Sequence, residues 1–300
     1  MEYILFAFLA LLASTGNTIF NRLGANHVSA LSNSTIKSFF IVIACFLISL
    51  VYGHVPTLYS LSPEDWLWIG VVGVLTCLDW FFYFLAIKRS HLEAFAPFCA
   101  SGILFFSNTI FLIFTFGMVT NGGKPLNVVF YIIGLLFLLS SLLYILFNKK
   151  INPSKKKLWV LYGTISVVTF AFVLLIAKTK LSHIQSDVIA FHQMTIVFVV
   201  MLISSLVTKT IKEITTIKPL DHLYIFIGAI FNALMMVFRY NALSCSGSVP
   251  AIVNVIIGLD FVLVSIATVL FFKAKNKLQI SIMIALVVIG MVFDVIAGLV

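Results

Sequence analysis

The chain has 300 residues, of which 62% are hydrophobic and only 10% charged, whereas a soluble domain is about half apolar and a quarter charged. With a mean hydropathy of +1.16, this composition excludes a soluble globular protein and predicts an all-α membrane protein, because lipid must be part of its solvent. The net charge of +9 comes from Lys and Arg that stand mostly between apolar runs. It is therefore expected to set topology at lipid headgroups and does not indicate nucleic-acid binding.

Ten apolar runs of about twenty residues follow one another, each long enough to cross the hydrocarbon core as a helix. The first carries Glu2 where a secretory signal needs a basic residue, so it is read as a span. The linkers are short, so no folded extramembrane domain is expected. The ten spans predict a multi-pass protein, which we expect in the cell (inner) membrane. The predicted spans are 3–21, 35–53, 66–87, 93–116, 127–147, 158–177, 187–208, 222–243, 248–272 and 278–299.

The sequence repeats itself at a constant offset of 156 residues. Apolar sequence matches itself by chance at Leu and Ile, but not easily at Pro, Asp, Gly and basic positions. The matched pairs include Pro63 with Pro219, Asp65 with Asp221, Gly102 with Gly258, Gly134 with Gly290, and Arg22 with Lys178. This pattern indicates a duplication, and the four glycines are expected to allow close helix approach.

The duplication predicts two five-helix repeats, 1–148 and 157–300, joined by a basic linker at 149–156. Because five is an odd number, the second repeat must enter the membrane from the opposite face. The two repeats are then inverted copies that can rock about a site between them, which is the architecture of many secondary transporters.

Polar residues inside the spans are the candidate functional residues, because an ionised side chain at a helix centre costs roughly 2.5–3.5 kcal/mol on insertion and usually faces the bundle interior. Helical spacing places Thr76, Asp79, Trp80 and Tyr83 on one face of the third span. The offset maps this face onto Asn232, Met235, Met236 and Arg239 of the eighth span. We expect the two faces to wall a cavity whose substrate contacts are Asp79, Trp80, Tyr83, Asn232, Met236, Arg239, His192 and Asn254.

The residue types leave the charge of the substrate open. Asp79 with its aromatic neighbours could hold a cation, whereas Arg239 could hold a carboxylate. Asp79 and Asp260 are also the candidates for carrying a coupled proton. Asn254 and Asp260 lie roughly 120° apart around an unbroken helix, so they are not expected to face the same cavity. Asp294 could simply pair with a neighbouring helix.

Two segments resemble the drug/metabolite transporter superfamily in its EamA-type ten-helix branch. They are WFFYFLAIKRSHLEAFAP at 80–97 and FRYNALSCSGSVPAIVN at 238–254. Lys37 stands where this family often has a basic residue at the opening of the second span. The sequence departs from the family in the turns before its fifth and tenth spans, where the glutamate of the family is missing. The resemblance implies a ten-helix transporter with two inverted repeats and both termini in the cytoplasm.

The distribution of charge implies the opposite orientation. Fifteen of the nineteen Lys and Arg, with Lys37 among them, are assigned to odd-numbered loops, and Arg239 is among the other four. Positive loops stay in the cytoplasm, so this count places both termini outside.

Known enzyme motifs are missing from the sequence. The segment at 122–125 lacks the first glycine and the hydroxyl of an ATP-binding loop. The four cysteines are isolated, so neither a metal nor a cofactor is expected. The sequence therefore favours a non-enzymatic transporter or exporter of a small organic solute, such as an amino acid, a metabolite or an amphipathic cation, acting as a monomer or a homodimer. A non-transporting scaffold or sensor, and an aspartyl protease using Asp79 and Asp260, are the alternatives.

Overall fold

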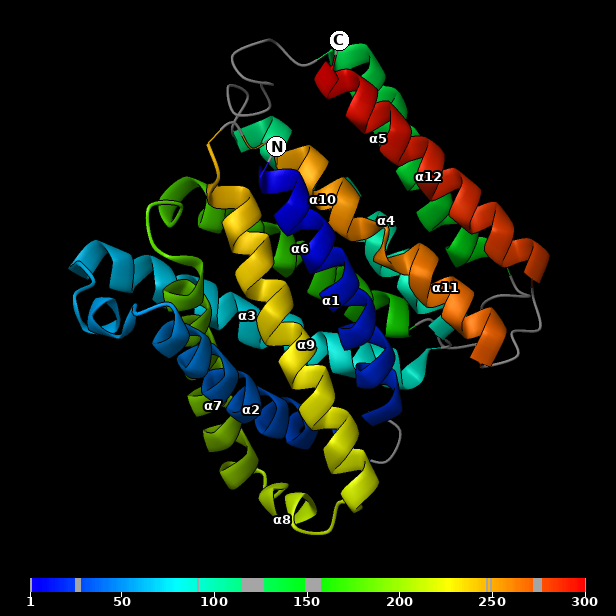
Figure 1. Ribbon diagram of the computed structural model, residues 1–300. Helices are drawn as coiled ribbons and strands as arrows, with labels where there is room; N and C mark the ends of the chain where they lie inside the picture. The colour runs from blue at the N-terminus through cyan, green and yellow to red at the C-terminus, as the bar shows by residue number, and fades with distance from the viewer. Residues whose placement is uncertain are drawn as a thin grey trace.

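The computed structural model describes residues 2–24, 28–90, 92–114, 127–148, 158–246, 248, 250–271 and 277–299. Within these ranges the chain is helical and forms no strand (Figure 1). The first part of the chain forms α1 (Glu2–Gly24), α2 (Ala30–Val51), a 3-10 helix (Val55–Tyr59), α3 (Pro63–Arg89), α4 (Leu92–Phe114) and α5 (Val128–Phe147). The second part forms α6 (Leu158–Lys180), α7 (Ser186–Val207), α8 (Ile211–Ile214), α9 (Pro219–Ser244), α10 (Pro250–Gly258), α11 (Asp260–Phe271) and α12 (Lys277–Leu299).

Eight of the described helices are long and apolar enough to cross a membrane. These are α1, α2, α3, α5, α6, α7, α9 and α12, and two shorter apolar stretches cover Phe95–Ile110 and Ile252–Ala267. The chain is thus a multi-pass α-helical membrane protein, as predicted. The count of ten spans stays a prediction.

The segment predicted as one helix at 248–272 is interrupted. Helix α10 ends at Gly258, Leu259 forms a turn, and α11 begins at Asp260. The amide of Leu259 donates to the carbonyls of both Val255 and Ile256, at 3.2 Å each. Glycine is a weak helix former, and an aspartate favours the start of a helix, so this short sequence favours a break that an apolar run alone does not reveal.

Helix α2 begins earlier than the predicted start at 35, because Ser29 caps it. The Ser29 hydroxyl accepts a hydrogen bond from the Ser32 amide at 3.2 Å, which satisfies one of the free amides of the first turn. As a consequence, Lys37 lies inside α2 and is buried. Arg239 is likewise buried inside α9. Their assignment to loops in the charge count was wrong.

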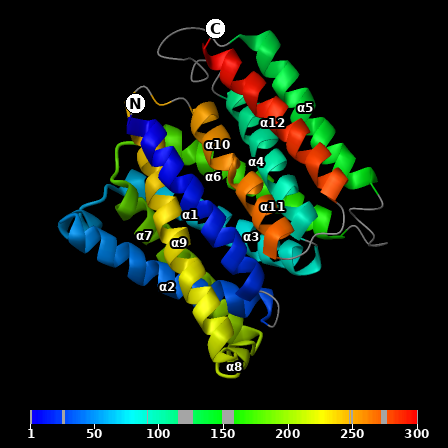
Figure 2. The ribbon, with the colours of Figure 1, turned by 45° about the vertical axis from the view of Figure 1, so that its right-hand side comes forward.

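The helices pack mainly across the two halves of the chain. Helix α1 lies against α9, α3 against α6, α2 against α7, and α5 against α12. Figure 2 shows α1 beside α9 and α5 beside α12 from a second direction. The two halves therefore do not form separate bundles, since α1 packs mainly on α9 and α6 packs mainly on α3.

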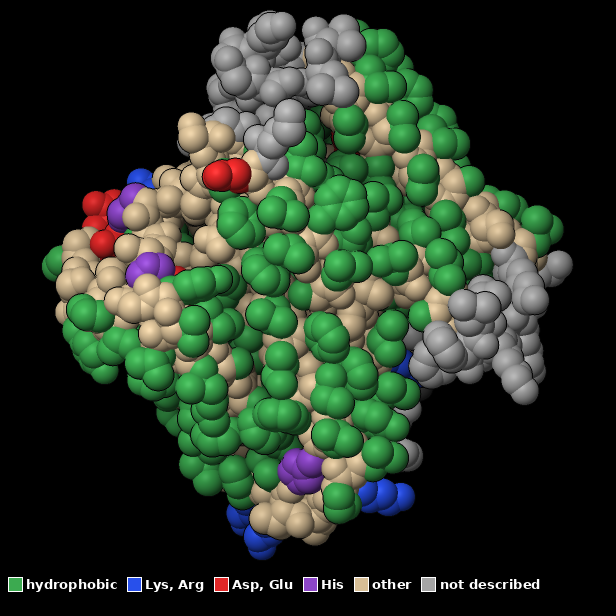
Figure 3. Space-filling view, viewed as in Figure 1, with side chains coloured by type: hydrophobic (Ala, Val, Ile, Leu, Met, Phe, Trp, Pro, Cys, Tyr) green, Lys and Arg blue, Asp and Glu red, His purple; other side chains and the backbone are tan. Residues whose placement is uncertain are grey.

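The outer surface of the bundle is apolar. Leu5, Leu12 and Ile203 are among many large hydrophobic side chains that are more than half exposed. In the space-filling view, hydrophobic side chains cover the middle of the visible face, while most of the basic and acidic side chains lie near its margins (Figure 3). This is the surface that a bilayer would cover.

Helices α5 and α12 approach each other closely at a pair of glycines. A Cβ atom added at Gly134 would lie 2.9 Å from the carbonyl oxygen of Gly290 and would also contact the Asp294 carboxylate. A Cβ added at Gly290 would lie 3.1 Å from the carbonyl oxygen of Gly134. The prediction that these glycines allow close approach is confirmed.

Candidate functional site

A cavity lies in the interior of the bundle, among α1, α2, α3, α4, α6, α7, α9, α10 and α11. About 140 Å³ of it is open to the centres of water-sized molecules, which leaves room for several waters or a small organic solute. The two faces that the sequence predicted as walls both line this cavity. The predicted contacts that line it are Asp79, Trp80, Tyr83, Asn232, Met236, Arg239 and Asn254.

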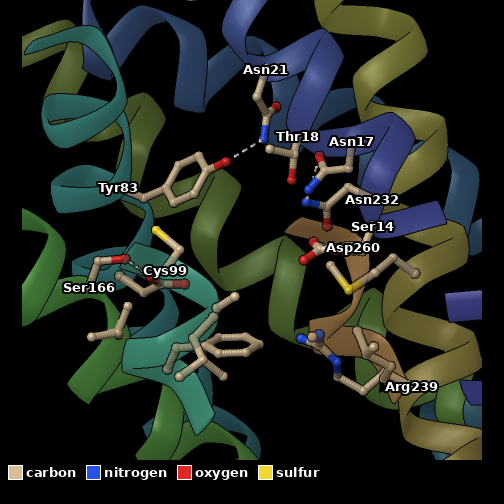
Figure 4. A pocket seen from close by; sticks show the side chains of 18 of the residues that line it. Ser14, Asn17, Thr18, Asn21, Tyr83, Cys99, Ser166, Asn232, Arg239 and Asp260 are labelled. Carbon is tan, nitrogen blue, oxygen red and sulfur yellow. Dashed lines mark hydrogen bonds between the residues drawn. The ribbon is translucent and has the colours of Figure 1, made fainter. Parts of the chain in front are cut away.

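Two carboxylates in the cavity accept hydrogen bonds from serines of the opposite half. The Ser166 hydroxyl of α6 donates to Asp79 Oδ1 at 2.5 Å, and the Ser14 hydroxyl of α1 donates to Asp260 Oδ2 at 2.5 Å. Figure 4 shows Asp260 and Ser166 on opposite sides of the central space. Each carboxylate is thus oriented by a neutral hydroxyl donor, and Asp260 also accepts a hydrogen bond from the backbone amide of Phe261.

Lys37 lines the cavity but was not predicted from the sequence as a substrate contact. Its side chain is 1% exposed, and its ammonium donates to the side-chain Oδ1 atoms of Asn17, at 2.5 Å, and Asn21. The ammonium also lies 5.3 Å from the centre of the Trp80 ring, within the range of a cation–π contact. The spacing of Asn17 and Asn21, four residues apart on one face of α1, is the sequence signal that could have located a buried partner.

Arg239 reaches the cavity from α9. Its guanidinium lies 4.9 Å from the centre of the Phe170 ring and points into the central space in Figure 4. Its charge interacts with those of Asp260 and Asp79. No carboxylate in the described part of the chain forms an ion pair with it.

Gln193 is a second cavity residue that was not predicted. It lies next to His192 and links three helices, since Tyr240 donates to its Oε1 at 2.5 Å and its Nε2 donates to Thr76 at 2.6 Å. His192 itself does not line the cavity. Its Nε2 lies 3.0 Å from the carbonyl oxygen of Leu58, and its ring lies 4.6 Å from the Trp66 ring.

Asn254 and Asp260 both line the cavity, although they were not expected to share it. The expectation assumed an unbroken helix, whereas Leu259 interrupts the helix between the two residues. Asp294 lies elsewhere and pairs with a neighbouring helix as expected, because Asn108 donates to its Oδ2 at 2.8 Å. Within the described residues, no group of three His, Cys, Asp or Glu side chains could hold a metal ion.

Comparison with known proteins gives the fold and no activity. No family model and no curated protein sequence matches the chain. Among the solved structures, 28 chains are similar. One of them, a crystal structure of a protein, has a TM-score of 0.68 and 15% sequence identity, and the match covers 99% of this chain and 97% of the other. At this identity the likeness shows a shared fold over the whole length.

Proposed function

We propose that the protein is a secondary transporter or exporter of a small organic solute, with the fold and alternating-access mechanism of the EamA-type branch of the drug/metabolite transporters. The observation that carries this proposal is the charged cavity inside a lipid-facing bundle. A bundle that served only as a scaffold would gain stability from a packed apolar interior, whereas this one places Lys37, Asp79, Arg239 and Asp260 around an open space.

Ten spans in two inverted repeats form part of the proposal. An offset of 156 residues exchanges α1 with α6 and α3 with α9, so the pairing of α1 with α9 and that of α6 with α3 are equivalent. Individual contacts support the same relation. Arg22 donates to the carbonyl oxygen of Ile87, and Lys178, at the equivalent position, donates to that of Leu243 at 2.7 Å.

The interruption between α10 and α11 also supports transport. Transporters place broken helices beside their substrate sites, because the freed backbone groups and helix ends can interact with a solute or an ion. Here the break lies between two cavity residues, Asn254 and Asp260. It is the only interruption inside a predicted span that the described residues contain.

Contacts between the two halves hold both ends of the bundle. At one end, His54 and Asp187 lie 2.9 Å apart, as do His183 and Asp65. At the other end, the hydroxyls of Thr35 and Ser205 lie 2.8 Å apart, and Ser32 donates to Glu213 at 3.0 Å. Alternating access would separate one set of contacts while the other remains closed. No comparable observation favours the protease alternative, since each cavity carboxylate binds a serine.

Flux measurements on purified protein in liposomes test the proposal. A panel of amino acids, other metabolites and amphipathic cations would be assayed for uptake and for exchange. We expect Asp79→Asn to lower the rate of the transported solute about tenfold or more, because a charged hydrogen-bonding group contributes about 1.5–3 kcal/mol. Asp294→Asn is the matched control, since it neutralises a buried carboxylate outside the cavity. A complete lack of flux for every solute, in sealed liposomes that contain correctly inserted protein, would overturn the proposal.

The same assay decides whether Asp79 or Asp260 carries a coupled proton. Flux is measured with and without a pH gradient across the liposome membrane. If one of the two carboxylates carries the proton, its replacement by asparagine abolishes the acceleration by the gradient while exchange without a gradient continues. Unchanged pH-dependent flux in both variants would remove both residues as proton carriers.

A further inference from the structure

Arg239 is a buried cation that forms no ion pair with the described residues, although its charge interacts with those of Asp260 and Asp79. Its side chain is 8% exposed, and its Nε is buried without a hydrogen-bond acceptor among the described residues. Among the described residues, the guanidinium stacks on the ring of Phe170. Leaving a charged donor unpaired in a low-dielectric interior is costly. A guanidinium of this kind matches a carboxylate, which it can bind through two parallel hydrogen bonds.

Asn254 is a second cavity residue with unpaired polar atoms. This residue is 4% exposed and lines the same cavity from α10. Both its Nδ2 and its Oδ1 are buried, and neither has a hydrogen-bond partner in the described part of the chain. Asn232 Oδ1 is a further acceptor in the cavity without such a partner. Of the eleven buried side-chain atoms without a hydrogen-bond partner among the described residues, four belong to residues that line this cavity: Arg239 Nε, Asn232 Oδ1 and both polar atoms of Asn254. Buried polar groups are usually paired, so these four atoms are candidate ligand contacts.

The other charges in the cavity restrict what can bind beside Arg239. Lys37 is already held by two amide oxygens. Asp79 accepts a hydrogen bond from Ser166, and Asp260 accepts one from Ser14 and one from the backbone amide of Phe261. A solute with only negative charge would be repelled by the two aspartates, and one with only positive charge would be repelled by Arg239 and Lys37. A solute that carries both charges complements both sets.

We infer that the solute is a small zwitterion whose carboxylate binds Arg239 and whose ammonium group faces Asp260. Asn254, on the other side of the break at Leu259, donates to and accepts from the same molecule. This inference rests on the proposed transport function and assigns it a substrate class. It also assigns Arg239 a task that Lys cannot fulfil, because an ammonium group lacks the planar fork.

Binding is tested on the full chain, without relying on flux. Cys99 lines the cavity, so its rate of modification by a thiol reagent reports occupancy, and Cys245 outside the cavity serves as an internal control. The twenty common amino acids are screened by this protection and by thermal shift, since a ligand that binds the folded state raises its stability. The best binder is then compared with its amide, which carries only the positive charge, and with its deaminated acid, which carries only the negative charge.

We expect the zwitterion to protect Cys99 and to bind at least about tenfold more tightly than either analogue. Arg239→Gln and Arg239→Lys should each weaken its binding by about tenfold to a hundredfold. Arg89→Gln is the matched control, because Arg89 also stacks on an aromatic ring, Tyr162, at 5.1 Å but is exposed and lies outside the cavity. It should bind the zwitterion as the unaltered protein does.

Asp260→Asn keeps the inference testable if the Arg239 variants do not fold. This variant should bind the zwitterion more weakly and the deaminated acid more tightly, because Asp260 no longer attracts the ammonium group or repels a lone carboxylate. Equal binding of the three compounds, or protection by the amide alone, would overturn the assignment. Flux of some other solute without zwitterion binding would overturn this inference and leave transport intact, whereas zwitterion binding without any flux would contradict transport and leave the site intact.

Discussion

The ammonium of Lys37 is held by neutral groups. The burial of its charge therefore depends on a few hydrogen bonds. Asn17 and Asn21 supply the acceptors, and Trp80 supplies a ring face. Removing an acceptor leaves a buried charge unsatisfied, while removing the charge itself leaves only neutral amides. The two kinds of substitution therefore differ in their cost.

We expect Asn17→Leu to lower the free energy of unfolding by about 1–3 kcal/mol, because it leaves the ammonium with one amide. Lys37→Met should cost less. The two changes should couple, so that Asn17→Leu costs less when Lys37→Met is already present. Thermal unfolding of the four proteins in one detergent measures this. Asn17 also accepts a hydrogen bond from Asn232 at 3.3 Å, so part of its cost is independent of Lys37. Strictly additive losses would show that the contact between Asn17 and Lys37 carries no energy of its own.

The individual cavity residues were predictable to different degrees. Asp79 and Arg239 stand out in the sequence because a charge in the middle of an apolar run is costly. Lys37 was counted with a loop although it lies near the start of the predicted span 35–53, and the cap at Ser29 places it further inside the helix. His192 and Gln193 are neighbours in the sequence, and only the direction of α7 decides that Gln193 lines the cavity.

At the scale of helices, the crossing of α5 and α12 depends on the absence of side chains. Gly134→Ala would place a methyl group against the backbone of Gly290 and the Asp294 carboxylate, so the helices must separate. We expect a loss of about 1–3 kcal/mol, seen as a lower unfolding temperature in detergent. Gly70→Ala is the control, since nothing lies within 4 Å of its added Cβ. Equal unfolding temperatures for the two variants would contradict the close crossing.

The helices themselves were largely predictable, and their ends and interruptions were less so. Long apolar runs reveal α1, α3 and α12 directly. The break at Leu259 was missed because the residues on both sides are apolar, and its cause is a local competition of hydrogen bonds. This element bears directly on the site, since Asn254 and Asp260 stand on either side of the break and both line the cavity.

The whole molecule has α8 at one end and the start of α1 at the other (Figure 1). Helix α1 begins and α12 ends at the same end, opposite α8 (Figure 1). Lys209, Lys212 and Lys218 flank α8. Removing Lys37 and Arg239 from the loop count takes one residue from each side, so the asymmetry persists.

We therefore expect a reporter fused after Val300 to lie outside the cytoplasm, because positive loops are retained inside. Alkaline phosphatase, which is active only outside, and green fluorescent protein, which is fluorescent inside, give opposite readouts. A fusion at 216, beside α8, is the control and should report the cytoplasm. A fluorescent, phosphatase-negative C-terminus would instead agree with the orientation that the family resemblance implies.

The pairing of α1 with α9 and of α3 with α6 has a consequence for biosynthesis. The ribosome releases α1 first, yet the helix that it contacts most extensively is made only when most of the chain is complete. Until then, the cavity-facing amides of α1, among them Asn17 and Asn21, must find temporary partners in the insertion machinery or in lipid headgroups. A nascent chain arrested before α9 should therefore be a substrate for membrane quality-control proteases, even though the six long helices made by then, α1, α2, α3, α5, α6 and α7, are each apolar enough to cross the bilayer.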